Sequence, residues 1–189
     1  SGKSQTSRKI VKLLREAGKK VVAIRHPMPY GDLVKQKVQR FATLEDLKLH
    51  NCTIEEIEEY EPHIALGGII YSGVDYEAIL REAEKEADVI LWDGGNNDLP
   101  FYKSDVVFTV ADPHRAGHEM YYYPGNTCLR IADAVIINKI DSASNESILK
   151  VIENTKSVNP DAVIIEGASP ITVDNPNIMK GKKVLVVED

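Results

Sequence analysis

Short apolar runs alternate with helical patterns along this chain, and this alternation limits the possible folds more than any other feature. Such an order is typical of βαβ units, which build a parallel sheet covered by helices on both faces. The predicted strands are residues 21–24, 68–71, 89–92, 106–110, 134–137, 162–165 and 184–187. The pattern therefore predicts an α/β fold in three layers with a mostly parallel sheet, and we expect residues 1–189 to form one domain.

Helix signals lie between these runs. Thr53 and Glu56 have the spacing of a capping box, which predicts that a helix begins there. Apolar residues at helical spacing predict further helices over residues 75–87, 127–132 and 147–155. Residues 26–67 are longer and more charged than a simple crossover, so we interpret them as a helical insertion close to the functional site.

The composition narrows the classes of partner. Hydrophobic residues make up 43% of the chain and charged residues 28%, which is ordinary for a globular protein, and the net charge is −6. A negative charge argues against binding to nucleic acid or to an anionic membrane, so we expect neither partner. Cys52 and Cys128 lie far apart in the sequence, which indicates neither a disulfide framework nor a zinc site. We expect a cytoplasmic protein.

The first four residues read Ser-Gly-Lys-Ser, which matches the end of the phosphate-loop motif G-x-x-x-x-G-K-[ST]. In that motif the helix N-terminus faces phosphate, the lysine binds the terminal phosphates and the Ser/Thr hydroxyl binds Mg²⁺. An apolar helical pattern follows and ends at Gly18, just before the run 21–24. The alternative is a turn that caps an ordinary helix. The candidate nucleotide-binding residues here are Ser1, Gly2, Lys3, Ser4 and Gln5.

The motif also predicts that residues are missing. Its first glycine and the buried strand that should precede it are absent, and the chain stops directly after the run 184–187. We therefore expect truncation at both ends. The absent strand would be the first strand of the fold and the run 21–24 the second, so the insertion over residues 26–67 would follow the second strand.

Asn138-Lys139-Ile140-Asp141 follows the run 134–137, and N-K-x-D at a strand end is how P-loop GTPases recognise guanine. The carboxylate of Asp141 would accept hydrogen bonds from N1–H and the exocyclic amine, Lys139 would pack along the base, and Asn138 would tie this loop to the phosphate loop. A buried contact of this kind that is left unpaired by the wrong base discriminates strongly. The alternative is a polar turn at a strand end.

Asp93 ends the run 89–92 and is followed by two glycines. An acid at this place beside a phosphate loop holds Mg²⁺, so Ser4 and Asp93 are the candidate metal ligands. The alternative is a simple Asp-Gly turn. After the run 162–165, Ala168 and Ser169 lie in a small-residue loop that could offer backbone N–H groups to the base, although such a loop is also ordinary.

Two loops are rich in cationic side chains, and both leave the carboxyl ends of predicted strands, where open α/β sheets bind ligands. They could form a pocket for a second, anionic substrate. The alternatives are scattered surface charge, or a zinc site formed by His114, His118 and Glu119. The candidate anion-binding residues are Arg25, His26, His114, Arg115 and His118.

Several strings resemble cyclic 2,3-diphosphoglycerate synthetases and the predicted GTPases grouped with them. They are GKSQTSR, RHPMPYGDL, QRFATLEDL, CTIEEIEEYEPHI, DYEAILREAEKEADVILWDGGNND, ADPHRAGHE, YYPGNTCLRIADAVIINKID and ASPITVDNP. The resemblance implies the central part of a longer P-loop NTPase, related to dimeric enzymes that act on metabolites. It also implies a reaction in which a nucleoside triphosphate and Mg²⁺ drive closure of 2,3-diphosphoglycerate to its cyclic diphosphate.

On this resemblance, Lys3, Ser4 and Asp93 would hold nucleotide and metal, and Asp32 or Asp98 would position an attacking oxygen. The N-K-x-D motif predicts GTP, whereas the implied reaction uses ATP, and the sequence leaves the two open. A second hypothesis is a regulatory or chaperone-like GTPase whose output is a conformational switch. A third is an α/β binding domain without turnover.

Overall fold

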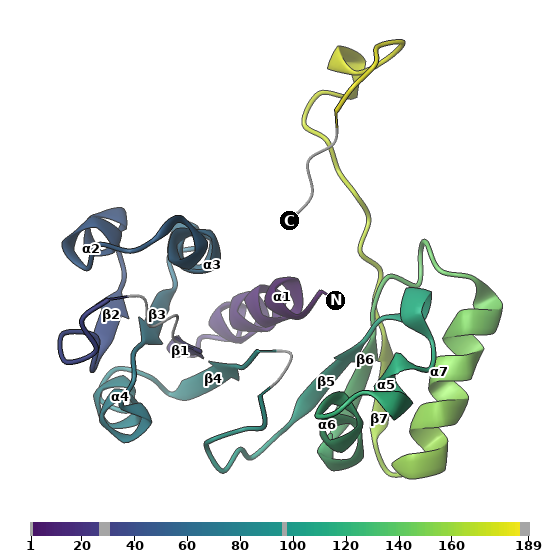
Figure 1. Cartoon of the computed structure of the whole chain (residues 1–189), viewed down its shortest axis with the longest axis horizontal. Helices are drawn as coiled ribbons and strands as arrows, with labels where there is room; N and C mark the ends of the chain where they lie inside the picture. Colours follow the sequence, from purple (N-terminus) through teal and green to yellow (C-terminus); the bar gives the residue numbers. More distant parts are fainter. Residues whose placement is uncertain (1, 27–30, 96–97, 186–189) are drawn as a thin grey trace.

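The computed structural model describes residues 2–26, 31–95 and 98–185. Its first four strands form sheet A in the order β2-β3-β1-β4 (Figure 1). β1 (Val21–Arg25) pairs in parallel with both β3 (Ile69–Ser72) and β4 (Val89–Asp93). The short edge strand β2 (Gln39–Phe41) runs antiparallel to β3 and was not predicted.

The remaining strands form sheet B, in which all neighbours are parallel. Its order is β5 (Phe108–Ala111), β6 (Ala134–Ile137) and β7 (Val163–Glu166). The predicted α/β class with mostly parallel strands is therefore confirmed, with the strands divided between two sheets. The apolar pattern could not show this division, because it marks strands but not which strands share hydrogen bonds.

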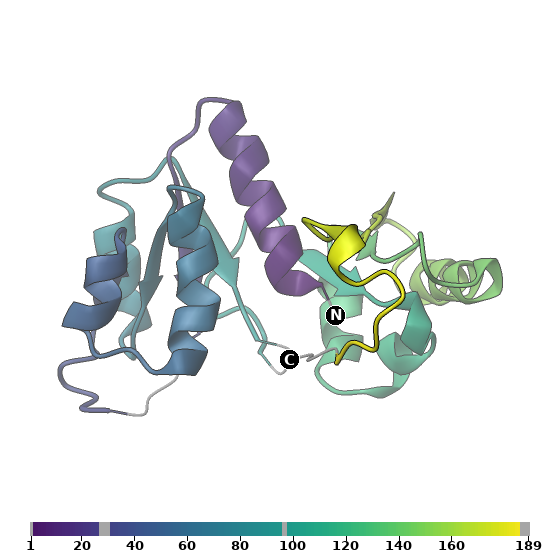
Figure 2. The same ribbon diagram turned by 90° about the horizontal axis from the view of Figure 1, so that it is seen from above.

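Sheet A is covered on both faces (Figure 2). On one face, α2 (Leu44–Leu49) and α3 (Ile54–Ala65) bury Phe41 and Tyr60 against the sheet. On the other, α4 (Tyr76–Ala83) buries Ile79 against Val22 and Ile24. These three layers follow from the strand 21–25, in which every residue is buried, as expected for a central parallel strand.

Helix α1 (Lys3–Glu16) packs on β1, β4 and α3, and its first turn points toward sheet B (Figures 1 and 2). Sheet B packs against α6 (Gly125–Ile131) and α7 (Asn145–Val158), which bury Leu129 and Val151. The short elements α5 (His118–Tyr121), η1 (Pro113–Arg115) and η2 (Pro176–Ile178) complete the fold.

The insertion at 26–67 contains α2, α3 and β2, so its predicted helical content is confirmed. The predicted capping box is present, because Thr53 Oγ1 accepts from the N–H of Glu56 and the Glu56 carboxylate accepts from the N–H of Thr53. Residues 184–185 are not in a strand, contrary to the prediction, and the rest of that run lies outside the described residues. In the described ranges, each helix is too short or too polar to cross a bilayer.

Candidate functional site

The start of α1 meets the loop after β6. Gly2 caps the helix at φ 96°, in the left-handed region that glycine tolerates. A Cβ atom at Gly2 would lie 1.9 Å from Nδ2 of Asn138, so the side chain of Asn138 occupies the space that any other residue would need. The two predicted motifs are thus brought together, with Asn138 against the phosphate-loop glycine. Ser1 lies outside the described residues.

The loop after β7 closes the same region. The N–H of Ser169 donates to Asp141 Oδ1 at 2.8 Å, and Ser169 Oγ lies 3.2 Å from Oδ1 of Asn138. The same hydroxyl is 3.4 Å from Oε1 of Gln5 at the start of α1. Ala168 is exposed beside this contact. The structure therefore joins the two loops predicted to surround the base with the start of α1, which was predicted to bind phosphate.

Lys139 adopts a left-handed conformation with φ 57°, and its ammonium lies 3.1 Å from Oδ2 of Asp112 at the end of β5. Burial alone would raise the pKa of Asp112. The Lys139 ammonium and the N–H of His114 outweigh burial, so the pKa of Asp112 lies below its usual value. Sequence reasoning missed Asp112, although an acid at a strand end was the signal that identified Asp93.

Asp93 ends β4, and its side chain is only 1% exposed. Oδ1 accepts from Lys3 Nζ at 3.0 Å and lies 3.2 Å from Nη1 of Arg25. Oδ2 is buried and makes no hydrogen bond among the described residues. A buried carboxylate oxygen without a donor fits the oxygen ligands that Mg²⁺ prefers. Ser4, the other predicted ligand, is half-buried in the first turn of α1. One or two carboxylates are enough, because substrate phosphates and water complete such sites.

Arg25 was predicted to bind a second anion, but its guanidinium is buried and directed at two carboxylates of this chain. Nη2 lies 2.7 Å from Oε1 of Glu59 on α3, and Nη1 lies 3.2 Å from Asp93. Glu59 was not predicted, since nothing in the sequence of α3 distinguishes it from the neighbouring glutamates. The next residue, His26, is half-buried with Nδ1 3.1 Å from Oδ2 of Asp98.

The remaining predicted anion-binding residues follow β5 in the chain. His114 and Arg115 are exposed after β5, where Nε2 of His114 lies 2.9 Å from Oγ of Ser142. His118 is exposed against the ring of Tyr122.

Asp32 and the zinc alternative are also located. Asp32 is exposed, and its Oδ1 accepts from the N–H of Val34 at 3.0 Å, so it caps a turn of the insertion. No three metal-ligating side chains converge among the residues that the structure describes. The zinc site considered for His114, His118 and Glu119 therefore has no geometric support.

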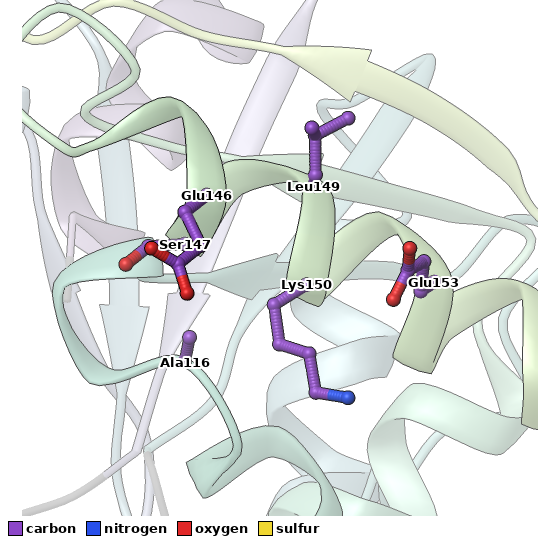
Figure 3. Close-up of a pocket in the computed structure, with 6 residues that line it drawn as sticks. All are labelled: Ala116, Glu146, Ser147, Leu149, Lys150 and Glu153. Carbon is purple, nitrogen blue, oxygen red and sulfur yellow. The ribbon is translucent and has the colours of Figure 1, made fainter.

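Two hollows of the described surface are lined by other residues than the predicted site residues. One of about 440 Å³ lies between Ala116 and the outer side of α7 (Figure 3). Its other lining residues are Glu146, Ser147, Leu149, Lys150 and Glu153. A second, of about 500 Å³, lies over the insertion and is lined by Leu33, Val34, Lys37, Val74, Asp75 and Tyr76. Lys3, Asp93 and Asn138 instead meet at the N-terminus of α1.

A Gly-Lys-Ser helix start, an acidic strand end and an N-K-x-D loop thus meet in an α/β fold. These features are the ones that the P-loop motif predicts, in an α/β fold of the predicted class. Comparison with protein-family models finds no match.

Relatives are found among named proteins. The chain is 67% identical to "Arginine synthetase ArcE" of Thermococcus kodakarensis over 188 residues, which are 100% of this chain and 42% of that protein. It is 30% identical over 112 residues to "Cyclic 2,3-diphosphoglycerate synthetase" of Thermococcus sibiricus, covering 57% of this chain and 25% of the relative. The protein of the same name in Pyrococcus furiosus is 22% identical over 127 residues, covering 61% of this chain and 30% of the relative.

The predicted resemblance to this group of synthetases is therefore confirmed. The chain spans less than half the length of each of these relatives. Among solved structures, HypB of Helicobacter pylori in complex with nickel has a TM-score of 0.43 at 14% identity, covering 89% of this chain and 87% of that one. HypB of Archaeoglobus fulgidus has a TM-score of 0.39 at 18% identity, covering 88% and 87%. Nothing further follows from likenesses at this level.

Proposed function

We propose that residues 1–189 form the nucleotide-binding domain of a Mg²⁺-dependent synthetase driven by a nucleoside triphosphate. The observation that carries this proposal is the convergence of Lys3, Asp93 and Asn138 at the first turn of α1. The relatives, all named as synthetases, support the reaction class.

Each residue has a role in this proposal. Lys3 leaves Asp93 and binds the terminal phosphates, where the N-terminus of α1 also favours negative charge. Ser4 and Oδ2 of Asp93 hold Mg²⁺, directly or through water. When bound, the metal neutralises the charge that develops on the transferred phosphoryl group. Phosphoryl transfer needs positioning and charge neutralisation more than a covalent group from the protein, and these residues supply both in the nucleotide half of the site.

For the base, we propose that guanine binds between the loops after β6 and β7. Asp141 is exposed between these loops, and its Oδ1 accepts from the N–H of Ser169. The motif favours GTP, while the synthetase reaction that the resemblance implies favours ATP. Competition between the two nucleotides for one fluorescent analogue decides this.

For the second substrate, we propose a precursor of arginine, so that arginine is the product. The chain is 67% identical to the arginine synthetase over 100% of the chain's own length. The burial of Arg25 between two carboxylates also removes one cation from the pocket predicted for a strongly anionic substrate.

Closure of 2,3-diphosphoglycerate is the second candidate. It is favoured by the relatives of that name and by the exposed His114 and Arg115 after β5. Two separate questions are whether the protein is a GTPase with a switch role and whether it forms the dimer that the resemblance implies. Turnover measurements answer the first question, and light scattering answers the second.

The test measures phosphate release with ATP and with GTP in the presence of each substrate class, and analyses the products. We expect turnover that depends on Mg²⁺, rises with arginine precursors and is lost in Lys3→Ala. A product derived from 2,3-diphosphoglycerate would favour the second candidate. Hydrolysis that neither substrate changes would contradict a synthetase and favour the switch GTPase.

A further inference from the structure

We propose that Arg25 is a positioning residue that allows Lys3 to leave Asp93 for the nucleotide phosphates, and that Glu59 limits this effect. This inference rests on the proposed function, since it concerns how the phosphate-binding lysine becomes available.

The register of sheet A places Arg25 and Asp93 directly opposite one another at the ends of β1 and β4. Both side chains are almost inaccessible, at 10% and 1% exposure. Lys3 reaches the same oxygen of Asp93 from α1, at 3.0 Å, so two cations share one buried carboxylate oxygen. The lysine that phosphate binding requires is therefore engaged by a carboxylate of the chain itself.

Removal of one partner from a buried ion pair is strongly unfavourable, because the remaining charge is left uncompensated. If Lys3 were the sole cation at Asp93, nucleotide binding would have to overcome this penalty. Arg25 compensates the charge of Asp93 when Lys3 turns away. Its Nη1 lies 3.2 Å from Oδ1 of Asp93, but the two groups are not aligned for a hydrogen bond. Once Lys3 has left, a shift of the Arg25 side chain can therefore form that hydrogen bond.

Glu59 acts in the opposite direction. It binds the other terminal nitrogen of Arg25 at 2.7 Å and draws the positive charge toward α3. The four side chains together are neutral, with two cations and two carboxylates. If the ion pair between Glu59 and Arg25 is weakened, the interaction of Arg25 with Asp93 becomes stronger. This change favours release of Lys3. The insertion that carries α3 is in this way coupled to the phosphate site.

The test measures the affinity for GDP in EDTA, where Mg²⁺ cannot supply the missing charge. A fluorescent GDP analogue reports binding. We expect the affinity for GDP to fall on the order of tenfold or more in Arg25→Met. We expect Arg25→Lys to restore binding because it restores the charge, and Glu59→Gln to bind at least as tightly as the parent protein.

Two further variants make the test independent of folding. In Arg25→Met with Asp93→Asn, no buried carboxylate holds Lys3, so we expect GDP affinity to return even though both charges are absent. Glu58→Gln removes an exposed charge from the same helix and should change nothing. Thermal unfolding of every variant accompanies the titrations.

Three results would overturn the inference. They are unchanged GDP affinity in Arg25→Met, equal losses in Arg25→Met and Glu59→Gln, or no recovery in the double variant. If the parent protein binds no nucleotide with or without Mg²⁺, the proposed function itself fails and the inference fails with it.

Discussion

Replacement of Gly2 by alanine is the sharpest test of how the two nucleotide motifs meet. At φ 96° an L-residue is strained, and the new Cβ would lie 1.9 Å from Nδ2 of Asn138. The variant must therefore shift the start of α1, displace the Asn138 side chain, or both. Nucleotide binding would have to restore the original geometry, so the strain should appear as lost affinity.

The magnitude follows from two contributions. The left-handed conformation costs about 1–2 kcal/mol for an alanine, and displacement of the Asn138 amide from its hydrogen bonds costs about 1 kcal/mol more. A total of about 2–3 kcal/mol corresponds to a roughly 30- to 150-fold weaker affinity, since each 1.4 kcal/mol is about tenfold. Equilibrium titration with a fluorescent GTP analogue measures this loss directly.

Gly18→Ala is the matched control. Gly18 also has a positive φ, of 79°, but a Cβ there would meet nothing within 4 Å. It follows α1 at the opposite end from the candidate site, so Gly18→Ala should lower the melting temperature and leave nucleotide affinity unchanged. If Gly2→Ala binds nucleotide as tightly as the parent protein, the inferred contact between the two motifs is wrong.

Three further predictions concern the base, the core and pH. Asp141→Asn should weaken GTP binding by more than 1 kcal/mol, on the order of the cost of one unpaired polar group, and leave ATP binding unchanged. Competition between the two nucleotides measures this, and an unchanged ratio of GTP affinity to ATP affinity would contradict the predicted guanine contact. Tyr60→Phe removes the hydrogen bond of 2.9 Å to Oγ of Ser72. It should lower the free energy of unfolding by about 1–2 kcal/mol in urea, whereas Tyr121→Phe, at an exposed position, should not. Burial outweighs the attraction of Asp93 and lowers the pKa of His63, so the unfolded chain binds this proton more readily. Stability should then fall as pH drops below about 6.5. His63→Asn should flatten that fall in urea unfolding and His118→Gln should not; equal slopes in all three proteins would refute the assignment.

Much of the fold was predictable because local signals agree with it. The apolar runs gave six of the seven observed strands to within two residues at either end, and the capping box of Thr53 and Glu56 marks the start of α3. The division into two sheets was not predictable, and neither was the antiparallel β2, since a run of three residues carries no pairing information.

The candidate site divides in the same way. Motifs identified Lys3, Asp93 and Asn138 because their chemistry depends on fixed residue types at fixed local spacings. Charge and a place at a strand end assigned Arg25 to a second substrate. Strand register places it opposite Asp93, and Glu59 completes its pairing. Whether these residues bind nucleotide, metal or substrate stays a prediction.

The sequence by itself determined the α/β class, the helix starts and the motifs, because each depends on residues close together in the chain. Only the tertiary structure decided which distant groups meet: Gly2 with Asn138, Asp112 with Lys139, and Arg25 with both Asp93 and Glu59. The physical reason is that such contacts depend on strand order and register. Composition and periodicity determine neither strand order nor register. Once the fold buries a charged side chain, that side chain requires a partner of opposite charge.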